Sequence, residues 1–110
     1  MKLIRLMFIV FAIGFANGGR ADENTAMGFR GCGTWIKDRA EKSWAATVEE
    51  GWLTGYLSGI AISSDVDFLK GADGNSFMFW MDNYCRDNPL SNLAVGGFQL
   101  ASELKKRMHK

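Results

Sequence analysis

Few side chains in this 110-residue chain could do chemistry. The chain has one histidine, His109, beside its C-terminus, and two cysteines, Cys32 and Cys85. If the two thiols are joined to each other, no histidine-assisted nucleophile and no histidine-containing zinc set can be assembled. The sequence therefore predicts no catalytic residue, no metal site and no cofactor.

The carboxylates supply two further candidates. Residues 65–67 (DVD) begin like a calcium loop, but Leu69 and Lys70 stand where an EF-hand needs an oxygen ligand and a glycine. Glu49 and Asp82 form a pair that could in principle do acid–base work. Carboxylates at this frequency are typical of a solvated surface, so we expect a protein that is not an enzyme.

Residues 1–21 have the layout of a secretory signal: two basic residues, an uncharged apolar run over residues 6–16, and then small residues. Cleavage is expected after Ala21, with Ala16 as the alternative site. A membrane anchor is the competing interpretation, but the apolar run spans only about 16 Å as a helix, against roughly 30 Å of hydrocarbon core. We expect a cleaved signal, export to the periplasm, and no membrane span after cleavage.

Cleavage changes the charge of the chain. Three of the 13 basic residues and none of the 12 acidic residues lie in residues 1–21, so the net charge falls from +1 to −2. A slightly acidic surface argues against nucleic acid as a partner, because that binding depends on neutralising phosphates.

The cysteine pair follows from export. An oxidising compartment favours a disulfide between Cys32 and Cys85, although two buried free thiols are the alternative. A domain this small buries only about 60–65% of its unfolded surface, so a covalent link matters to its stability.

The rest of the chain is predicted to be all-α. Residues 22–31 are polar and glycine-containing, and we expect a flexible N-terminal arm there, followed by a helical domain over residues 32–107. That domain is a small bundle of four to five short helices, because helical periodicity recurs and no β-alternating run competes. The first expected helix begins after Thr34 as its cap, and the second and third cover residues 45–62 and 76–85. The fourth begins at Asn88-Pro89, with asparagine as N-cap and proline at the first helical position.

The second expected helix contains Gly51, Gly55 and Gly59, which lie at successive turns on one face of the helix and form a glycine stripe. Each glycine costs about 1 kcal/mol relative to alanine inside a helix, so three on one face predict that another backbone packs closely there. Apolar residues cover most of the remaining circumference, which favours a buried central helix over a membrane dimerisation face.

Aromatic residues are numerous beyond the expected signal, and they include Trp35, Trp44, Trp52, Trp80, Phe68, Phe77, Phe79 and Tyr84. Most are expected to build the core. Met78, Phe79 and Phe98 lie off the main apolar stripes of their helices, and we predict that they form an exposed patch that binds protein.

Three motifs then carry a family resemblance: residues 32–35 (CGTW), residues 51–59 (GWLTGYLSG) and residues 84–89 (YCRDNP) before a final helix. Their order resembles the HdeA/HdeB-type periplasmic proteins, which are small, exported, all-helical and closed by one disulfide. It also resembles the Tai family of type VI secretion immunity proteins, which share a GY-x-x-G helix and a Cys before a terminal helix.

The first resemblance implies an acid-stress chaperone that loosens in acid and binds unfolding client proteins. Protonation of the 12 carboxylates and of His109 would take the cleaved chain to about +11, enough self-repulsion to open a small domain. The second resemblance implies a binding module that stays folded and blocks a specific periplasmic toxin. A protein with another periplasmic role is the third interpretation. Either of the first two makes proteins the partners, and the sequence also permits a homodimer.

Overall fold

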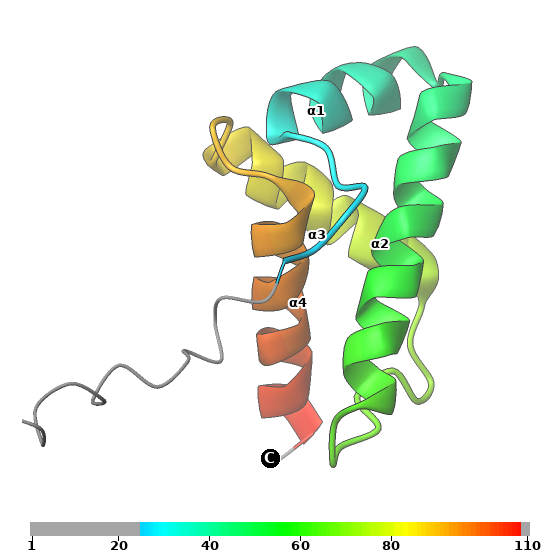
Figure 1. Cartoon of the computed structure of the whole chain (residues 1–110), viewed down its shortest axis with the longest axis vertical. Coiled ribbons are helices and arrows are strands. Elements are labelled where there is room, and N and C mark those ends of the chain that lie inside the picture. Colours follow the sequence, from blue (N-terminus) through cyan, green and yellow to red (C-terminus); the bar gives the residue numbers. More distant parts are fainter. Residues whose placement is uncertain (1–24, 109–110) are drawn as a thin grey trace, which may run out of the picture.

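A computed structural model describes residues 25–108 as four α-helices (Figure 1). They are α1 (Cys32–Glu41), α2 (Trp44–Ile62), α3 (Gly74–Asp87) and α4 (Leu93–Met108). Residues 25–108 contain no strand, and a disulfide joins Cys32 to Cys85. The predicted all-α fold closed by one disulfide is therefore confirmed. The expected signal, residues 1–21, and His109 lie outside the described residues.

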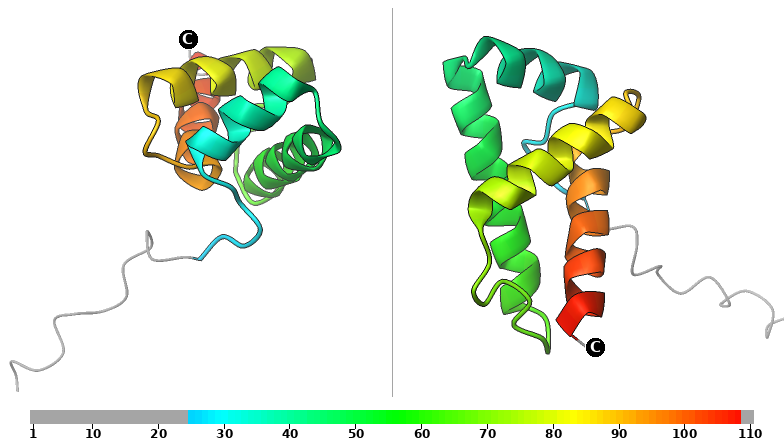
Figure 2. Two further views of the ribbon diagram at one scale, coloured as in Figure 1. Left: turned by 90° about the horizontal axis from the view of Figure 1, so that it is seen from above. Right: turned by 180° about the vertical axis from the view of Figure 1, so that it is seen from behind.

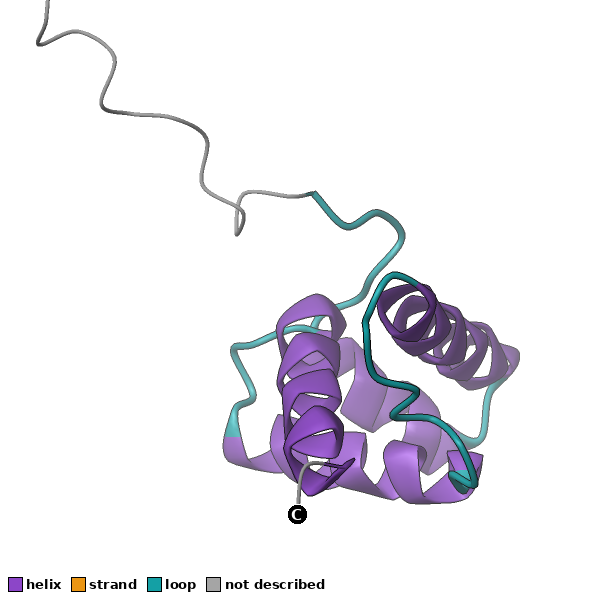
Figure 3. Cartoon of the chain, turned by 90° about the horizontal axis from the view of Figure 1, so that it is seen from below, coloured by secondary structure: helices purple, strands orange, loops and turns teal. Residues whose placement is uncertain are grey.

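The four helices form two layers (Figures 1 and 2). α2 and α4 run side by side in the same direction, and α1 and α3 cross them on one side. Figure 3, seen from below, shows α2 and α4 nearly end-on with the crossing pair behind them. The side of the α2–α4 pair that faces away from α1 and α3 has no helix over it in the described chain.

The core lies between these layers. Its largest fully buried side chains come from all four helices, and the disulfide is buried among them. They are Cys32, Trp35, Leu53, Leu57, Met81, Cys85 and Leu93. The apolar face that α2 buries is narrow, because Leu53 and Leu57 lie on one side of the helix only. The predicted central helix, buried nearly all round, is therefore wrong.

Two predicted helix starts are also wrong. α1 begins at Cys32, not after a Thr34 cap. α4 begins at Leu93, where the Asn92 side-chain oxygen accepts a hydrogen bond from the Val95 amide at 2.9 Å. Asn88 instead closes α3, because its backbone and side-chain N–H groups both donate to the Tyr84 carbonyl. The prediction fails because Asn-Pro occurs both where a helix ends and where one begins, as an N-cap followed by proline.

Residues 25–31, the N-terminal strap, are held against the helices rather than extending from them. The Arg30 carbonyl accepts from the Leu93 amide at 3.0 Å, and Gly31 pairs with Asn92 in an isolated antiparallel bridge. Farther along the strap, the Met27 carbonyl accepts a 2.6 Å hydrogen bond from the Trp52 indole. These contacts differ from the flexible arm predicted for residues 22–31, of which residues 25–31 are described.

Candidate functional site

The most site-like feature of the described chain is an apolar groove of about 1060 Å³. α2 forms one wall, α4 forms the other, and the strap closes one side. None of the fourteen residues that line the groove carries a charge. Four aromatic side chains dominate it, and they come from all three of these segments: Phe29, Trp52, Tyr56 and Phe98.

The aromatic side chains on the α2 wall are fixed in place by their neighbours. Trp52 and Tyr56 stack one turn apart with ring centroids 4.8 Å apart, and Phe29 meets Trp52 edge-on at 6.3 Å. The hydrogen bond from Trp52 to Met27 orients the indole further. Gly28 lies over that indole with φ +81°, so the strap can pass close to the ring only with glycine at this position. The groove wall is thus preorganised.

The predicted role of the glycine stripe is wrong. A Cβ placed on Gly51, Gly55 or Gly59 would meet no described atom within 4 Å, so no other part of the described chain packs on this stripe. Gly51 and Gly55 instead line the groove. Their missing side chains leave the outward face of α2 smooth and open.

Close helix packing occurs at two other glycines, in α4. A Cβ on Gly96 would lie 2.7 Å from the Tyr84 ring, and one on Gly97 would lie 2.9 Å from the Tyr56 ring. Both α4 glycines are buried, and each accepts an aromatic side chain from a neighbouring helix. This pair performs the close packing that the sequence assigned to the glycines of α2.

The predicted protein-binding patch is divided by the structure. Met78 is buried at 8% exposure and belongs to the core, so its assignment to the patch is wrong. Phe79 and Phe98 are both exposed, at 62% and 61%. Only Phe98 lines the groove, and Phe79 lies on α3 outside it. The apolar surface therefore centres on the groove, and Phe98 is the one member of the predicted patch that lies there.

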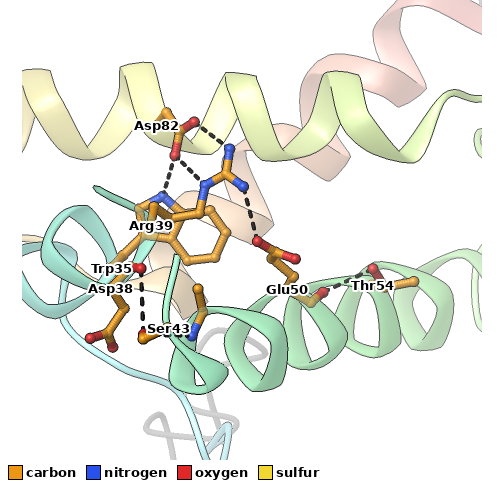
Figure 4. Close-up of polar contacts among 8 residues, drawn as sticks. Trp35, Asp38, Arg39, Ser43, Glu50, Thr54 and Asp82 are labelled. Atoms are coloured by element: carbon orange, nitrogen blue, oxygen red, sulfur yellow. Dashed lines mark hydrogen bonds and ion pairs between the residues drawn. The ribbon is translucent and has the colours of Figure 1, made fainter. Parts of the chain in front are cut away.

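A polar cluster joins three helices on the other side of α2 (Figure 4). Arg39 of α1 donates to both carboxylate oxygens of Asp82 in α3, at 2.9 and 2.6 Å, and to Glu50 of α2 at 2.9 Å. The Trp35 indole donates to one of the same Asp82 oxygens at 2.8 Å. We call these four residues the Arg39 network. It ties α1 to both neighbouring helices.

The Arg39 network shifts two ionisation equilibria. Burial alone would raise the pKa of Asp82, but the hydrogen bonds from Arg39 and Trp35 outweigh it and lower that pKa below its ordinary value of 3.8. The hydrogen bond to Asp82 in turn raises the pKa of Arg39. Both groups therefore stay charged over the neutral range, and the network is a structural ion pair.

Glu49 has the opposite environment. It is 3% exposed, and neither carboxylate oxygen has a hydrogen-bond partner. Burial first, and then the neighbouring carboxylate of Asp38, raise the pKa of Glu49 to about 7, while Arg30 opposes the shift. The groups around Glu49 thus differ from those around Asp82. The two carboxylates that the sequence suggests as an acid–base pair do not share a common environment.

Over residues 25–108, no three His, Cys, Asp or Glu side chains are grouped as a metal site would require. Within the same residues, no helix has the length and apolar character needed to span a bilayer. The disulfide is compatible with an oxidising, exported compartment.

Comparisons with protein-family models, with curated proteins and with solved structures find no match to this chain. Sequence reasoning missed the strap and the Arg39 network. The spacing of Trp35 and Arg39, four residues apart on one helix face, is a signal that could have suggested a shared carboxylate partner.

Proposed function

We propose that this chain is a non-enzymatic periplasmic protein-binding domain that binds an apolar segment of another protein in the α2–α4 groove. The observation that carries the proposal is the groove itself, open, uncharged and lined by four aromatic side chains on a disulfide-closed scaffold. Buried aromatic anchors supply most of the binding energy in protein interfaces, and an uncharged wall fits an uncharged partner surface.

The dimensions support a helical or short extended partner segment. The lining residues of α2 run from Gly51 to Ile60, which is about 14 Å along the helix axis. A groove between two parallel helices can accept the apolar face of a third helix, the mode in which side chains at i, i+3 and i+4 act as anchors. The smooth rim at Gly51 and Gly55 leaves room for the backbone of that segment.

Within this class we place an HdeA-like acid-stress chaperone first. The supporting observation is the dependence of the Arg39 network on an ionised Asp82, because protonation of Asp82 in strong acid removes the ion pair between Arg39 of α1 and Asp82 of α3. The disulfide would keep the chain compact while α1 and α3 loosen, and apolar surface would become available to unfolding clients.

A Tai-like immunity protein that blocks a periplasmic toxin is the alternative. The observation that favours it is the preorganisation of the groove, where Trp52 is held by Met27, Tyr56 and Phe29 before any partner is present. A rigid site of this kind suits one specific partner better than many unfolded clients.

The groove can be tested with two matched variants. Phe98→Ser removes an aromatic side chain from the groove, and Phe79→Ser removes one of nearly equal exposure outside it. We expect the Phe98 variant to lose suppression of client aggregation, measured by light scattering, while the Phe79 variant keeps it. Equal loss in both variants, or in neither, would contradict binding in the groove.

A pH series from about 2 to 7 separates the two forms of the proposal. A chaperone should suppress aggregation chiefly in acid, where its near-UV circular dichroism signal weakens. No suppression at any pH, with an unchanged near-UV signal into acid, would reject the chaperone and leave the rigid toxin-binding form.

A further inference from the structure

A second cavity, of about 400 Å³, lies between α1 and α3. We call it the cationic notch, because three of its lining residues are basic and only one is acidic. None of its lining residues belongs to the α2–α4 groove, so the notch is a separate site. They are Ile36, Arg39, Ala40 and Lys42, from α1 and its C-cap, and Asp82 and Arg86, from α3.

Arg39 and Asp82 form a fixed wall of the notch. The two Asp82 oxygens accept hydrogen bonds from Arg39 at 2.9 and 2.6 Å and from the Trp35 indole at 2.8 Å (Figure 4). Arg39 also donates to Glu50, and its guanidinium carbon lies 5.4 Å from the centroid of the Trp35 ring. These charges are paired within the chain. Even with Glu50 counted, positive charges outnumber negative ones at the notch by three to two.

Lys42 and Arg86 carry the unpaired charges. Over residues 25–108, neither side chain forms an ion pair. The Arg86 guanidinium donates from Nη1 to the Asn83 side chain at 2.8 Å, and its Nε and Nη2 groups have no partner among the same residues. An Nε–Nη2 edge is the part of arginine that binds a carboxylate through two parallel hydrogen bonds. The notch therefore offers a free carboxylate-binding edge beside a free ammonium group.

The backbone of Lys42 supports a role for its side chain. Lys42 is the C-cap of α1 with φ 52° and ψ 39°, and no other non-glycine residue of the described chain has a positive φ. Glycine or asparagine is favoured at such a position, because the left-handed backbone strains a residue that has a larger side chain. Strained residues of this kind are concentrated at functional sites.

We propose that the cationic notch binds the C-terminal residue of a peptide or protein chain, with a free α-carboxylate and an apolar side chain. The Nε–Nη2 edge of Arg86 binds the carboxylate, and the Lys42 ammonium supplies the second positive charge. Ile36 and Ala40, both exposed, form the apolar part of the notch and contact the terminal side chain.

The size and the composition of the notch favour a chain terminus. A cavity of about 400 Å³ is near the lower end of the range for small-ligand sites, so it suits one residue rather than a folded surface. A terminal residue carries a carboxylate and an apolar side chain on the same carbon, which matches the cations and the apolar residues of the notch. In Asp or Glu, no apolar group extends beyond the side-chain carboxylate.

The inference goes beyond the proposed function and does not depend on it, because the notch is tested with a small probe and without client or toxin. The probe is acetyl-Ala-Leu, a dipeptide with a free C-terminal carboxylate, titrated into residues 22–110 at about 0.15 M salt. Two-dimensional NMR of the backbone amides should show saturable shifts at the end of α1 and around Arg86 in α3. The C-terminally amidated dipeptide should bind at least about tenfold more weakly, because it lacks the charge.

Variants at the notch assign the contacts. Arg86→Gln removes the carboxylate-binding edge, and Lys42→Asn removes the ammonium with a residue that tolerates left-handed backbone. Both positions are exposed, so the fold is preserved, and each variant should weaken binding of acetyl-Ala-Leu at least about fivefold. Lys37→Gln removes an exposed cation of α1 outside the notch and should leave binding within about twofold, since salt screens distant charges.

Three results would overturn the proposal. One is the absence of saturable shifts with acetyl-Ala-Leu. Another is an equal loss in Lys37→Gln and in the notch variants, which would mean that only the overall charge matters. The third is equally tight binding of acetate or inorganic phosphate, which would show a general anion site rather than a site for a chain terminus.

Discussion

The two sides of α2 differ in the interactions that their side chains make. Toward α1 and α3, a disulfide and the Arg39 network join the helices, and each charged group of that network has a defined partner. Toward α4, the groove and the outward face hold aromatic side chains and glycines with open space beside them. One side joins its helices through a covalent bond and charged hydrogen bonds, and the other leaves apolar surface exposed.

The difference indicates that one side of α2 stabilises the fold and the other provides exposed apolar surface. The covalent and ionic contacts of the first side give a short chain enough stability to leave the second side open, which a domain with so small a core could not otherwise do. Substitutions that alter only one of the two sides test this division, because each should change the free energy of unfolding through the contacts of that side alone.

The largest effect is expected from removal of the disulfide. Cys32→Ala with Cys85→Ala should lower the free energy of unfolding by about 4 kcal/mol, because the bridge spans 53 residues and its loss frees the unfolded chain. Urea denaturation followed by Trp fluorescence measures it, and the wild-type protein under reducing conditions should match the variant. An unchanged midpoint would mean that the bridge contributes little to holding α1 on α3.

The next effect concerns the Arg39 network. Asp82→Asn removes the carboxylate that Arg39 and Trp35 share, and should cost about 2–3 kcal/mol at neutral pH. Because the pKa of Asp82 is lowered in the fold, its contribution is present above the ordinary value of 3.8 and is lost as pH falls below it.

The unfolding free energies of wild type and Asp82→Asn should therefore converge in strong acid. Asp67→Asn, at an exposed loop position, is the matched control and should change stability little at any pH. A constant difference between wild type and Asp82→Asn throughout the acid range would contradict the assigned role of the carboxylate. It would also remove the main structural support for acid-induced loosening.

The sequence predicts the fold class and the disulfide better than the side-chain contacts on either side of α2. Helical periodicity, the paired cysteines and the signal-like composition of residues 1–21 are local or compositional signals, and they predict the fold class and the bridge. The spacing of Trp35 and Arg39 suggests a shared carboxylate, but Asp82 lies 43 residues from Arg39 in the chain, so tertiary structure is needed to identify it. The predictions for Asn88 and Met78 are wrong because both depend on position to within one or two residues. A shift of that size turns a helix start into a helix end, or moves a side chain from an exposed face to a buried one.

Glu49 is expected to give an effect of opposite sign to that of Asp82. Because its pKa is raised from 4.5 to about 7, the folded state keeps a proton that the unfolded state loses, and stability falls as pH rises between these values. Glu49→Gln should abolish this slope and stabilise the protein by on the order of 2 kcal/mol above neutral pH.

Unfolding by urea across the weakly acidic to neutral range measures the slope, with Glu41→Gln at an exposed position of α1 as the control. If Glu49→Gln keeps the wild-type slope, Glu49 is ionised in the fold and another group accounts for the pH dependence. Taken together, the lowered pKa of Asp82 and the raised pKa of Glu49 predict a stability maximum in weak acid, close to the ordinary carboxyl pKa values.

The smallest effects come from two glycines, Gly97, which is packed between α4 and α2, and Gly55, which is open on the outward face of α2. Gly97→Ala puts a methyl group against the Tyr56 ring and the Leu53 side chain and should cost about 1–2 kcal/mol. Gly55→Ala adds the same methyl group in open space and should stabilise by about 0.5–1 kcal/mol through helix propensity. Thermal unfolding measures both. Because the sequence alone predicts a loss at Gly55, the sign of that single change decides whether the outward face of α2 is free or covered within the chain.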